Sequence, residues 1–152
     1  LVPRVGGFEG GTVTWAPTNI TYGHNNRSAQ FRLPQNRYCI ENRAADMTMN
    51  VYLAFSMTLA AAVEGIKMKI HPGKPTDQDL YEMTDKEFKK LGIKRLPRNL
   101  LMALEALKND KLSDEVIGTV MKNSLLAYKN DEWERYHQAV TDWEVKEYLR
   151  LY

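Results

Sequence analysis

The chain changes character near residue 46, from a segment that favours strands and loops to one that favours helices. Residues 1–46 hold five of the nine glycines and short β-branched runs at residues 12–14 and 20–22, which are typical of strands and turns. In residues 47–152, apolar side chains recur at the three- and four-residue spacing of amphipathic helices. The sequence therefore predicts an α+β chain whose strand-forming part precedes its helical part.

Capping residues mark helix starts in the second part. Thr84 and Thr141 are each followed three positions later by a glutamate, Glu87 and Glu144 respectively. This is the capping-box pattern, which satisfies two free backbone N–H groups at a helix start. Ser113, which precedes two acidic residues, is predicted to be the N-cap of a further helix.

The apolar run at residues 47–70 is predicted to be a buried helix rather than a membrane span. Phe55 and Leu59 belong to an apolar stripe at helical spacing, but Glu64 and Lys67 interrupt the run with charges. Membrane-spanning helices need about 20 predominantly apolar residues. We therefore expect this helix to pack against a protein core.

Length, charge and cysteine content indicate which partners and which cellular compartment are compatible with this chain. The 152 residues, 43% of them hydrophobic, are enough for one core. A net charge of +2 is too small to indicate nucleic acid or an anionic membrane as a partner. The single cysteine cannot form an internal disulfide, which is consistent with the cytoplasm. We therefore predict a cytoplasmic protein that binds neither nucleic acid nor membranes.

Four arginines and one glutamate lie close together in two short segments that are predicted to be neighbouring strands. They are Arg27, Arg32, Arg37, Arg43 and Glu41. Arginine binds phosphate and carboxylate through paired donors, and a carboxylate among arginines suits a Mg²⁺ shared with substrate phosphates. The pattern is therefore compatible with an ATP-phosphate and metal site. It is equally compatible with a polar strand pair whose charges neutralise one another.

Several motifs resemble those of the glutamine synthetase family and follow the family's order along the chain. They are Asn26-Arg27-Ser28-Ala29 with Arg32 and Pro34, Glu41-x-Arg43 with Asn50-x-Tyr52-Leu53 after it, Leu59-Ala60-Ala61-Ala62-Val63-Glu64-Gly65-Ile66, Lys94-Arg95-Leu96-Pro97, Glu132-Trp133-Glu134-Arg135-Tyr136-His137 and Thr141-Asp142-Trp143-Glu144. The resemblance covers essentially the whole chain and is to the C-terminal portion of the family's catalytic domain. It implies antiparallel strands of an incomplete sheet in residues 1–46, which form the strand and loop part of an active site, followed by a helical C-terminal region in residues 47–152.

The resemblance also implies a role for each charged residue of the cluster. Arg27 and Arg32 would be catalytic: Arg27 resembles the arginine that meets the transferred phosphate, and Arg32 the arginine that holds the ATP phosphates. Glu41 would bind Mg²⁺ or Mn²⁺ next to those phosphates. Arg43 resembles the arginine that holds the glutamate substrate.

Two positions depart from the family pattern. Trp15 stands where glutamine-forming members have a flap glutamate that helps to deprotonate ammonium; an indole cannot take a proton and provides an apolar wall instead. Cys39, expected to be a buried thiol, stands where the family has a phosphate-binding arginine, and Arg37 would replace that arginine. Both changes resemble the branch that forms γ-glutamyl amides from alkylamines, but they are also compatible with a divergent ammonia-using enzyme.

The implied activity is that of an ATP-dependent ligase of nitrogen metabolism. Glutamate would be joined to ammonia or an alkylamine through γ-glutamyl phosphate, with ATP as co-substrate, in a homo-oligomeric ring, a dodecamer. The chain is expected to be a fragment that is inactive alone, because the ATP motif and most metal carboxylates of the family are missing. The alternatives are a non-catalytic or regulatory member of the family, or a helical module that binds a protein partner.

Overall fold

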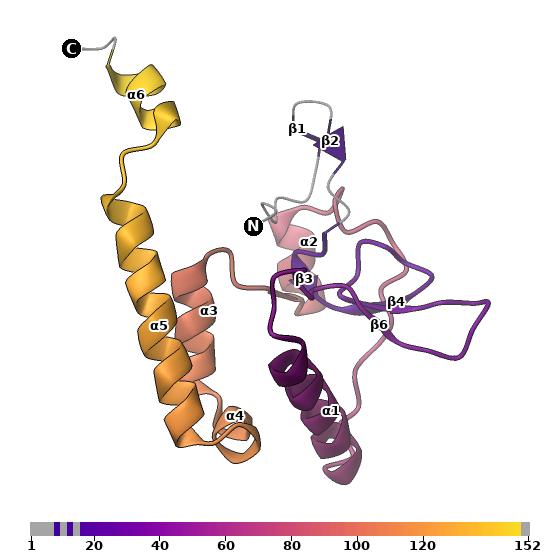
Figure 1. Cartoon of the computed structure of the whole chain (residues 1–152). Helices are drawn as coiled ribbons and strands as arrows, with labels where there is room; N and C mark the ends of the chain where they lie inside the picture. Colours follow the sequence, from indigo (N-terminus) through magenta and orange to yellow (C-terminus); the bar gives the residue numbers. More distant parts are fainter. Residues whose placement is uncertain (1–7, 10–11, 14–15, 150–152) are drawn as a thin grey trace. The chain divides into compact units, whose positions relative to one another are not determined.

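The computed structural model describes residues 8–9, 12–13 and 16–149 (Figure 1). The strands in these residues are β1 (Phe8–Glu9), β2 (Thr12–Val13), β3 (Asn19–Ile20), β4 (Tyr22–His24), β5 (Phe31–Leu33), β6 (Glu41–Asn42) and β7 (Lys94–Arg95). The helices are α1 (Val51–Lys67), α2 (Asp85–Leu91), α3 (Leu100–Asn109), α4 (Lys111–Val116), α5 (Thr119–Gln138) and α6 (Asp142–Tyr148). The α+β fold class predicted from the sequence is confirmed.

The chain divides into two compact units, Leu1–Arg98 and Asn99–Tyr152. All the strands of the described residues, together with α1 and α2, belong to the first unit. Helices α3 to α6 make up the second unit. The strand β7 lies in the part of the chain that was expected to be helical, where it pairs with β3.

The strands form small sheets that are antiparallel except at one pair. β1 pairs with β2, β3 with β7, and β5 with β6, all antiparallel. β4 and β5 are parallel, so the expectation of antiparallel strands is wrong at this pair. The reason is the connecting loop: Asn25 takes a left-handed conformation with φ of 51°, and its N–H donates to the Leu33 carbonyl at 2.8 Å. The loop thereby brings β5 alongside β4, with both strands running in the same direction.

A small apolar core in the first unit fixes the loop between β4 and β5. Ala29, at the end of this loop, is fully buried against Leu80 and Phe88, with Met83 and Ile93 packed against them. Leu80 precedes α2 and Phe88 belongs to it. The core therefore ties the residues that precede β5 to a segment about fifty residues later in the chain.

The helix starts follow the predicted capping residues with one exception. Thr84 and Thr141 each form a complete capping box. Ser113, however, is not an N-cap: Asp110 caps α4, and its carboxylate accepts from the Ser113 N–H at 2.8 Å. The prediction is wrong because an aspartate three residues earlier already satisfies the donor at that helix start.

Helix α1 differs from the expectation of a buried helix. It contains no buried residue, and the side chains of Phe55 and Leu59 are 68% and 67% exposed. Its apolar stripe is therefore not covered by other residues that the structure describes. As to membranes, none of the helices in residues 16–149 is both long enough and apolar enough to cross one.

The second unit is held together by a buried lysine as well as by apolar packing. Helix α3 packs along α5, and α4 also packs against α5 (Figure 1). Lys122 of α5 is only 3% exposed. Its Nζ donates to the Asp110 carbonyl at 2.7 Å and lies 3.0 Å from Asp114 Oδ1. A buried ammonium is stable only when such partners replace its hydration, so Lys122 fastens the start of α4 to α5.

We predict that Lys122→Met lowers the free energy of unfolding by about 1–3 kcal/mol, because polar groups at the start of α4 lose a buried partner. Hydrogen exchange should show reduced protection of the α4 amides in particular. Lys108→Met, at an exposed position on α3, is the matched control and should change stability by no more than about 0.5 kcal/mol. Unchanged protection of α4 in the Lys122 variant would contradict this account.

Candidate functional site

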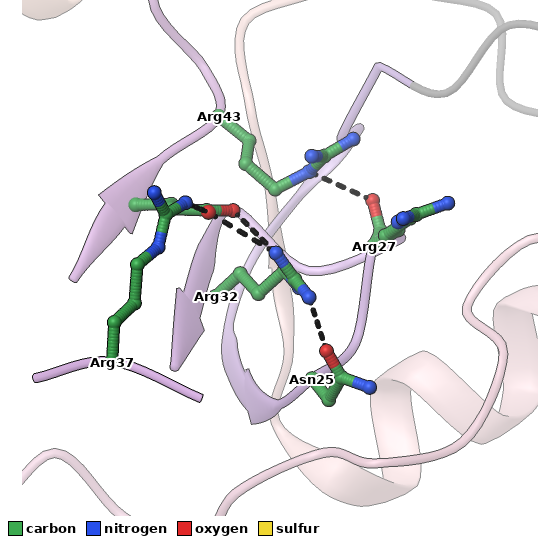
Figure 2. Close-up of polar contacts among 6 residues, drawn as sticks. Asn25, Arg27, Arg32, Arg37 and Arg43 are labelled. Carbon is green, nitrogen blue, oxygen red and sulfur yellow. Dashed lines mark hydrogen bonds and ion pairs between the residues drawn. The ribbon is translucent and has the colours of Figure 1, made fainter. Parts of the chain in front are cut away.

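The strand register places Arg32 opposite Glu41. β5 and β6 pair antiparallel with these two residues as direct partners. Arg32 Nη1 donates to both carboxylate oxygens of Glu41, at 3.1 Å and 2.9 Å (Figure 2). Their side chains are only 15% and 22% exposed. The prediction of neighbouring strands is confirmed for Arg32 and Glu41, whereas Arg27, Arg37 and Arg43 lie outside β5 and β6.

Two further residues complete the surroundings of this pair. Arg37 Nη2 also donates to Glu41 Oε1, so that the carboxylate lies between two guanidinium groups. On the other side, Arg32 Nη2 donates to Asn25 Oδ1 (Figure 2). Arg37 is the more exposed of the two arginines, with 60% of its side chain accessible. We call Arg32, Arg37 and Glu41 the charge cluster.

The charge cluster keeps Glu41 ionised. The hydrogen bond from Arg32 is the largest cause that lowers the pKa of Glu41; partial burial acts in the opposite direction, and Arg37 lowers the pKa further. The hydrogen bond to Glu41 in turn raises the pKa of Arg37. An ionised carboxylate between arginines can serve as an ion-pair partner or as a ligand for a hard cation.

A buried donor of the charge cluster has no hydrogen-bond partner in the part of the chain that the structure describes. This donor is Arg32 Nε. Buried N–H groups are nearly always paired, so a buried N–H group without a partner indicates a position where an ion can bind. An anion such as a phosphate, bound after a small rearrangement, would satisfy this donor.

The remaining two arginines meet at the backbone. Arg43 Nε donates to the carbonyl of Arg27 at 3.0 Å. Figure 2 shows the guanidinium of Arg27 extending away from Arg32 and Arg43. The structure thus joins Arg32, Arg37 and Glu41 through their side chains, while Arg27 contributes its carbonyl to Arg43 and directs its side chain elsewhere.

Arg27 is among the residues that line an open depression of about 480 Å³. His24 and three residues from a distant segment, Asp77, Asp79 and Tyr81, also line it. The Asp77 carboxylate accepts from the His24 N–H at 2.7 Å, and this bond is the main cause of the lowered pKa of Asp77.

The segment at residues 77–81 was not among the residues predicted from the sequence to line a site. Tyr81 is partly buried, which raises its pKa, and its hydroxyl donates to the Ala16 carbonyl at 3.1 Å. The signal that could have indicated the segment is its alternation of acidic and polar residues after a proline turn at residues 71–75.

Of the two positions that depart from the family pattern, the structure describes only Cys39. Trp15 lies outside the described residues. Cys39 is exposed, so the expectation of a buried thiol is wrong. The reason is that β6 begins only at Glu41: Tyr38 and Ile40, on either side of Cys39, are in a loop and are 112% and 69% exposed. No apolar layer therefore covers the sulfur.

Glu41 can supply only part of a metal site. Among the residues that the structure describes, no group of three or more His, Cys, Asp and Glu side chains could hold a metal ion. Its carboxylate has the donor chemistry that Mg²⁺ and Mn²⁺ prefer. Glu41 therefore fits the role of one ligand among several, with the other ligands coming from outside these residues.

Comparison with known proteins decides the family. Residues 11–148 match the family model described as "Glutamine synthetase, catalytic domain". The chain belongs to the glutamine synthetase family. The resemblance that the motifs predicted is therefore confirmed.

Two relatives with different enzyme names show the same sequence identity to this member of the glutamine synthetase family. The glutamine synthetase of Methanocaldococcus jannaschii is 40% identical over 137 residues, which cover 88% of this chain and 30% of that protein. The glutamate–methylamine ligase of Methyloversatilis universalis is also 40% identical, over 139 residues that cover 91% of this chain and 31% of that protein. The chain is therefore equally similar to a relative named for glutamine and to one named for methylamine.

A solved structure supports the same family assignment. The structure described as "Apo GmaS without ligand" superimposes on this chain with a TM-score of 0.74 at 34% sequence identity. The superposition covers 88% of this chain and 30% of the chain in that structure. The chain thus spans less than a third of the length of the curated relatives it matches here. Any activity of a whole enzyme is therefore a proposal.

Proposed function

We propose that this chain supplies part of the active site of an ATP-dependent glutamate–amine ligase. The observation that carries the proposal is the Arg32–Glu41 pair, held on adjoining strands inside the region that matches the glutamine synthetase catalytic domain. The parent would be a cytoplasmic homo-oligomeric ring, a dodecamer, without nucleic-acid or membrane partners. The chain alone would be inactive, because catalysis needs groups from the rest of the catalytic domain.

The proposed reaction has two steps. An oxygen of the glutamate γ-carboxylate attacks the γ-phosphorus of ATP, and ADP leaves. The amine nitrogen, after loss of a proton from its ammonium form, then attacks the γ-carbonyl carbon of γ-glutamyl phosphate. Inorganic phosphate leaves, and the product is glutamine or an N-alkyl γ-glutamyl amide.

In this reaction the arginines neutralise and orient, since phosphoryl transfer depends mainly on positioning and charge stabilisation. Arg27 and Arg32 would stabilise negative charge on the moving phosphoryl group. Arg37, the most exposed arginine of the charge cluster, would contact the other ATP phosphates. Arg43 would orient glutamate through its carboxylate.

Glu41 would hold Mg²⁺ or Mn²⁺ through its ionised carboxylate. A divalent cation at this position supplies positive charge next to the ATP phosphates. For Glu41 to act as a ligand, Arg32 and Arg37 must release at least one carboxylate oxygen and turn toward phosphate. The unpaired Nε of Arg32 is consistent with such a change, because phosphate would satisfy it.

A second candidate is a non-catalytic or regulatory family member. The observation that favours it is that Arg32 and Arg37 already pair with the Glu41 carboxylate, so this carboxylate needs no metal. The exposed apolar side chains of Val120, Tyr136 and Trp143, on α5 and α6, likewise favour the alternative of a helical interaction module. Activity of the parent separates these candidates from the ligase.

The amine substrate provides the test. We expect the full-length parent, assayed with ATP and glutamate, to show a higher kcat/KM for methylamine than for ammonia, because an indole at position 15 favours an apolar group by about 0.8 kcal/mol per methyl, or roughly fourfold. Trp15→Glu should shift the ratio toward ammonia by at least that factor, because a carboxylate can accept the proton of ammonium.

Trp143→Glu is the matched control, since Trp143 is exposed on α6 and the chemical change is the same. It should leave the ratio unaltered. A parent that forms no γ-glutamyl product with either amine would rule out the ligase proposal. A wild type that prefers ammonia by a wide margin would instead leave the ligase standing and remove the specificity role of Trp15.

A further inference from the structure

Asn26 uses every hydrogen-bonding group of its side chain to hold the arginine loop, residues 25–30. Its Nδ2 donates to the carbonyls of Thr76 and Gln78, at 2.7 Å and 2.8 Å. Its Oδ1 accepts from both the N–H and the hydroxyl of Ser28, at 2.8 Å and 2.7 Å. A carboxamide is the side chain that combines two donors with an acceptor in this geometry, so the site is specific for the amide.

Other contacts hold the same loop against residues 76–80, which we call the support segment. The Ser28 hydroxyl, in a side chain that is 3% exposed, accepts from the Leu80 N–H at 3.0 Å. The preceding strand approaches so closely that a Cβ on Gly23 would lie 2.3 Å from the Thr76 carbonyl oxygen. The loop and the support segment are therefore in close polar contact, although about fifty residues separate them in sequence.

Arg27 lies between the two residues that make these contacts. Asn26 and Ser28 anchor the backbone on either side of it, and Arg43 Nε donates to its carbonyl at 3.0 Å. Its guanidinium extends from this anchored backbone, away from Arg32 (Figure 2). A misplacement of about 1 Å at a catalytic group can cost about a hundredfold in rate, so an anchored backbone matters for a residue that meets a transferred group.

We propose that Asn26 is a positioning residue for Arg27, and that the support segment is the scaffold through which it acts. The inference rests on the proposed function, in which Arg27 contacts the phosphoryl group. An aspartate at this position would keep the shape but lose both donors. It would also place a negative oxygen against two carbonyl oxygens, which should displace the loop.

The test is a double-mutant cycle in the full-length parent enzyme, with Asn26→Asp and Arg27→Ala made singly and together. Residues that act through one another give non-additive effects, whereas independent residues give additive ones. We expect Asn26→Asp to lower kcat by about tenfold or more in the wild-type background, with a smaller change in the KM for glutamate. In the Arg27→Ala background, the same substitution should lower kcat by less than about twofold.

Asn123→Asp is the matched control, because Asn123 is exposed on α5 and the substitution introduces the same charge. It should leave kcat unchanged in both backgrounds. An equal fold loss from Asn26→Asp in both backgrounds would show a general structural role and overturn the inference. If Asn26→Asp does not fold, Ser28→Ala, which removes only the bridging hydroxyl, is taken through the same cycle and judged by the same criterion.

The outcomes also separate this inference from the proposed function. An active parent in which Arg27→Ala leaves kcat unchanged overturns the positioning role while the ligase activity stands. A parent that transfers no γ-glutamyl group from glutamate, ATP and either amine removes the proposed function, and with it the role of Asn26.

Discussion

Arg32→Ala in the full-length parent is expected to lower kcat by about a hundredfold or more, since a charge-assisted contact to a transition state contributes about 3 kcal/mol. Arg32 is the least exposed member of the charge cluster, and Glu41 and Asn25 hold its two terminal nitrogens in place. A guanidinium held by such contacts needs only a small turn toward phosphate to stabilise developing charge. The measurement is steady-state kinetics at saturating ATP, glutamate and amine.

Two further variants show whether the loss of kcat depends on the paired donors of Arg32 and on its position. Arg32→Lys keeps the positive charge but loses the paired donors, so its kcat should lie between those of the wild type and Arg32→Ala. Arg135→Ala removes an arginine of α5 that is 63% exposed and pairs only locally with Asp131, and should leave kcat unchanged. If Arg32→Ala behaves like Arg135→Ala, the charge cluster is an ion-pair network without a catalytic role.

The charge cluster could be predicted from sequence because its geometry is local. The Arg32–Glu41 pair arises from two short strands nine residues apart, and the alternation of side chains in a strand makes such a pair foreseeable. The capping boxes at Thr84 and Thr141 were predictable for the same reason, since each is complete within four residues. Contacts between residues only a few positions apart can therefore be predicted from the sequence alone.

Contacts between distant segments were not predictable from the sequence. The support segment lies about fifty residues after the arginine loop in the sequence. Asn26 donates to the backbone carbonyls of Thr76 and Gln78, and any residue type has such a carbonyl, so the sequence does not indicate these contacts. The parallel β4–β5 pair depends on the conformation of the loop at Asn25, which periodicity does not report. The exposure of α1 was missed for another reason: a helical stripe shows which face is apolar but not what covers it.

Glu41→Gln in the parent is expected to raise the Mg²⁺ or Mn²⁺ concentration needed for half-maximal activity by more than about tenfold. Even residues that contact a metal's ligands but not the metal itself contribute about 10–100-fold to metal affinity. The substitution keeps the shape of the side chain and removes the charge that binds a cation. The measurement is activity against free metal, with Mn²⁺ binding followed by electron paramagnetic resonance as a readout independent of turnover. Glu134→Gln, at an exposed position on α5, is the matched control and should leave both readouts unchanged.

The ion-pair alternative predicts a different pair of results for the same variant. The lowered folded-state pKa of Glu41 contributes stability that is present above the pKa of the unfolded chain and is lost as the pH falls through the folded value. Glu41→Gln removes that contribution under either hypothesis, so stability near neutral pH cannot distinguish them. The metal requirement can, because two arginines lose a partner in both cases but a cation loses a ligand in only one. An unchanged metal requirement together with reduced stability near neutral pH would therefore assign Glu41 to the ion pair alone. The ligands of the parent's metal would then lie outside this cluster.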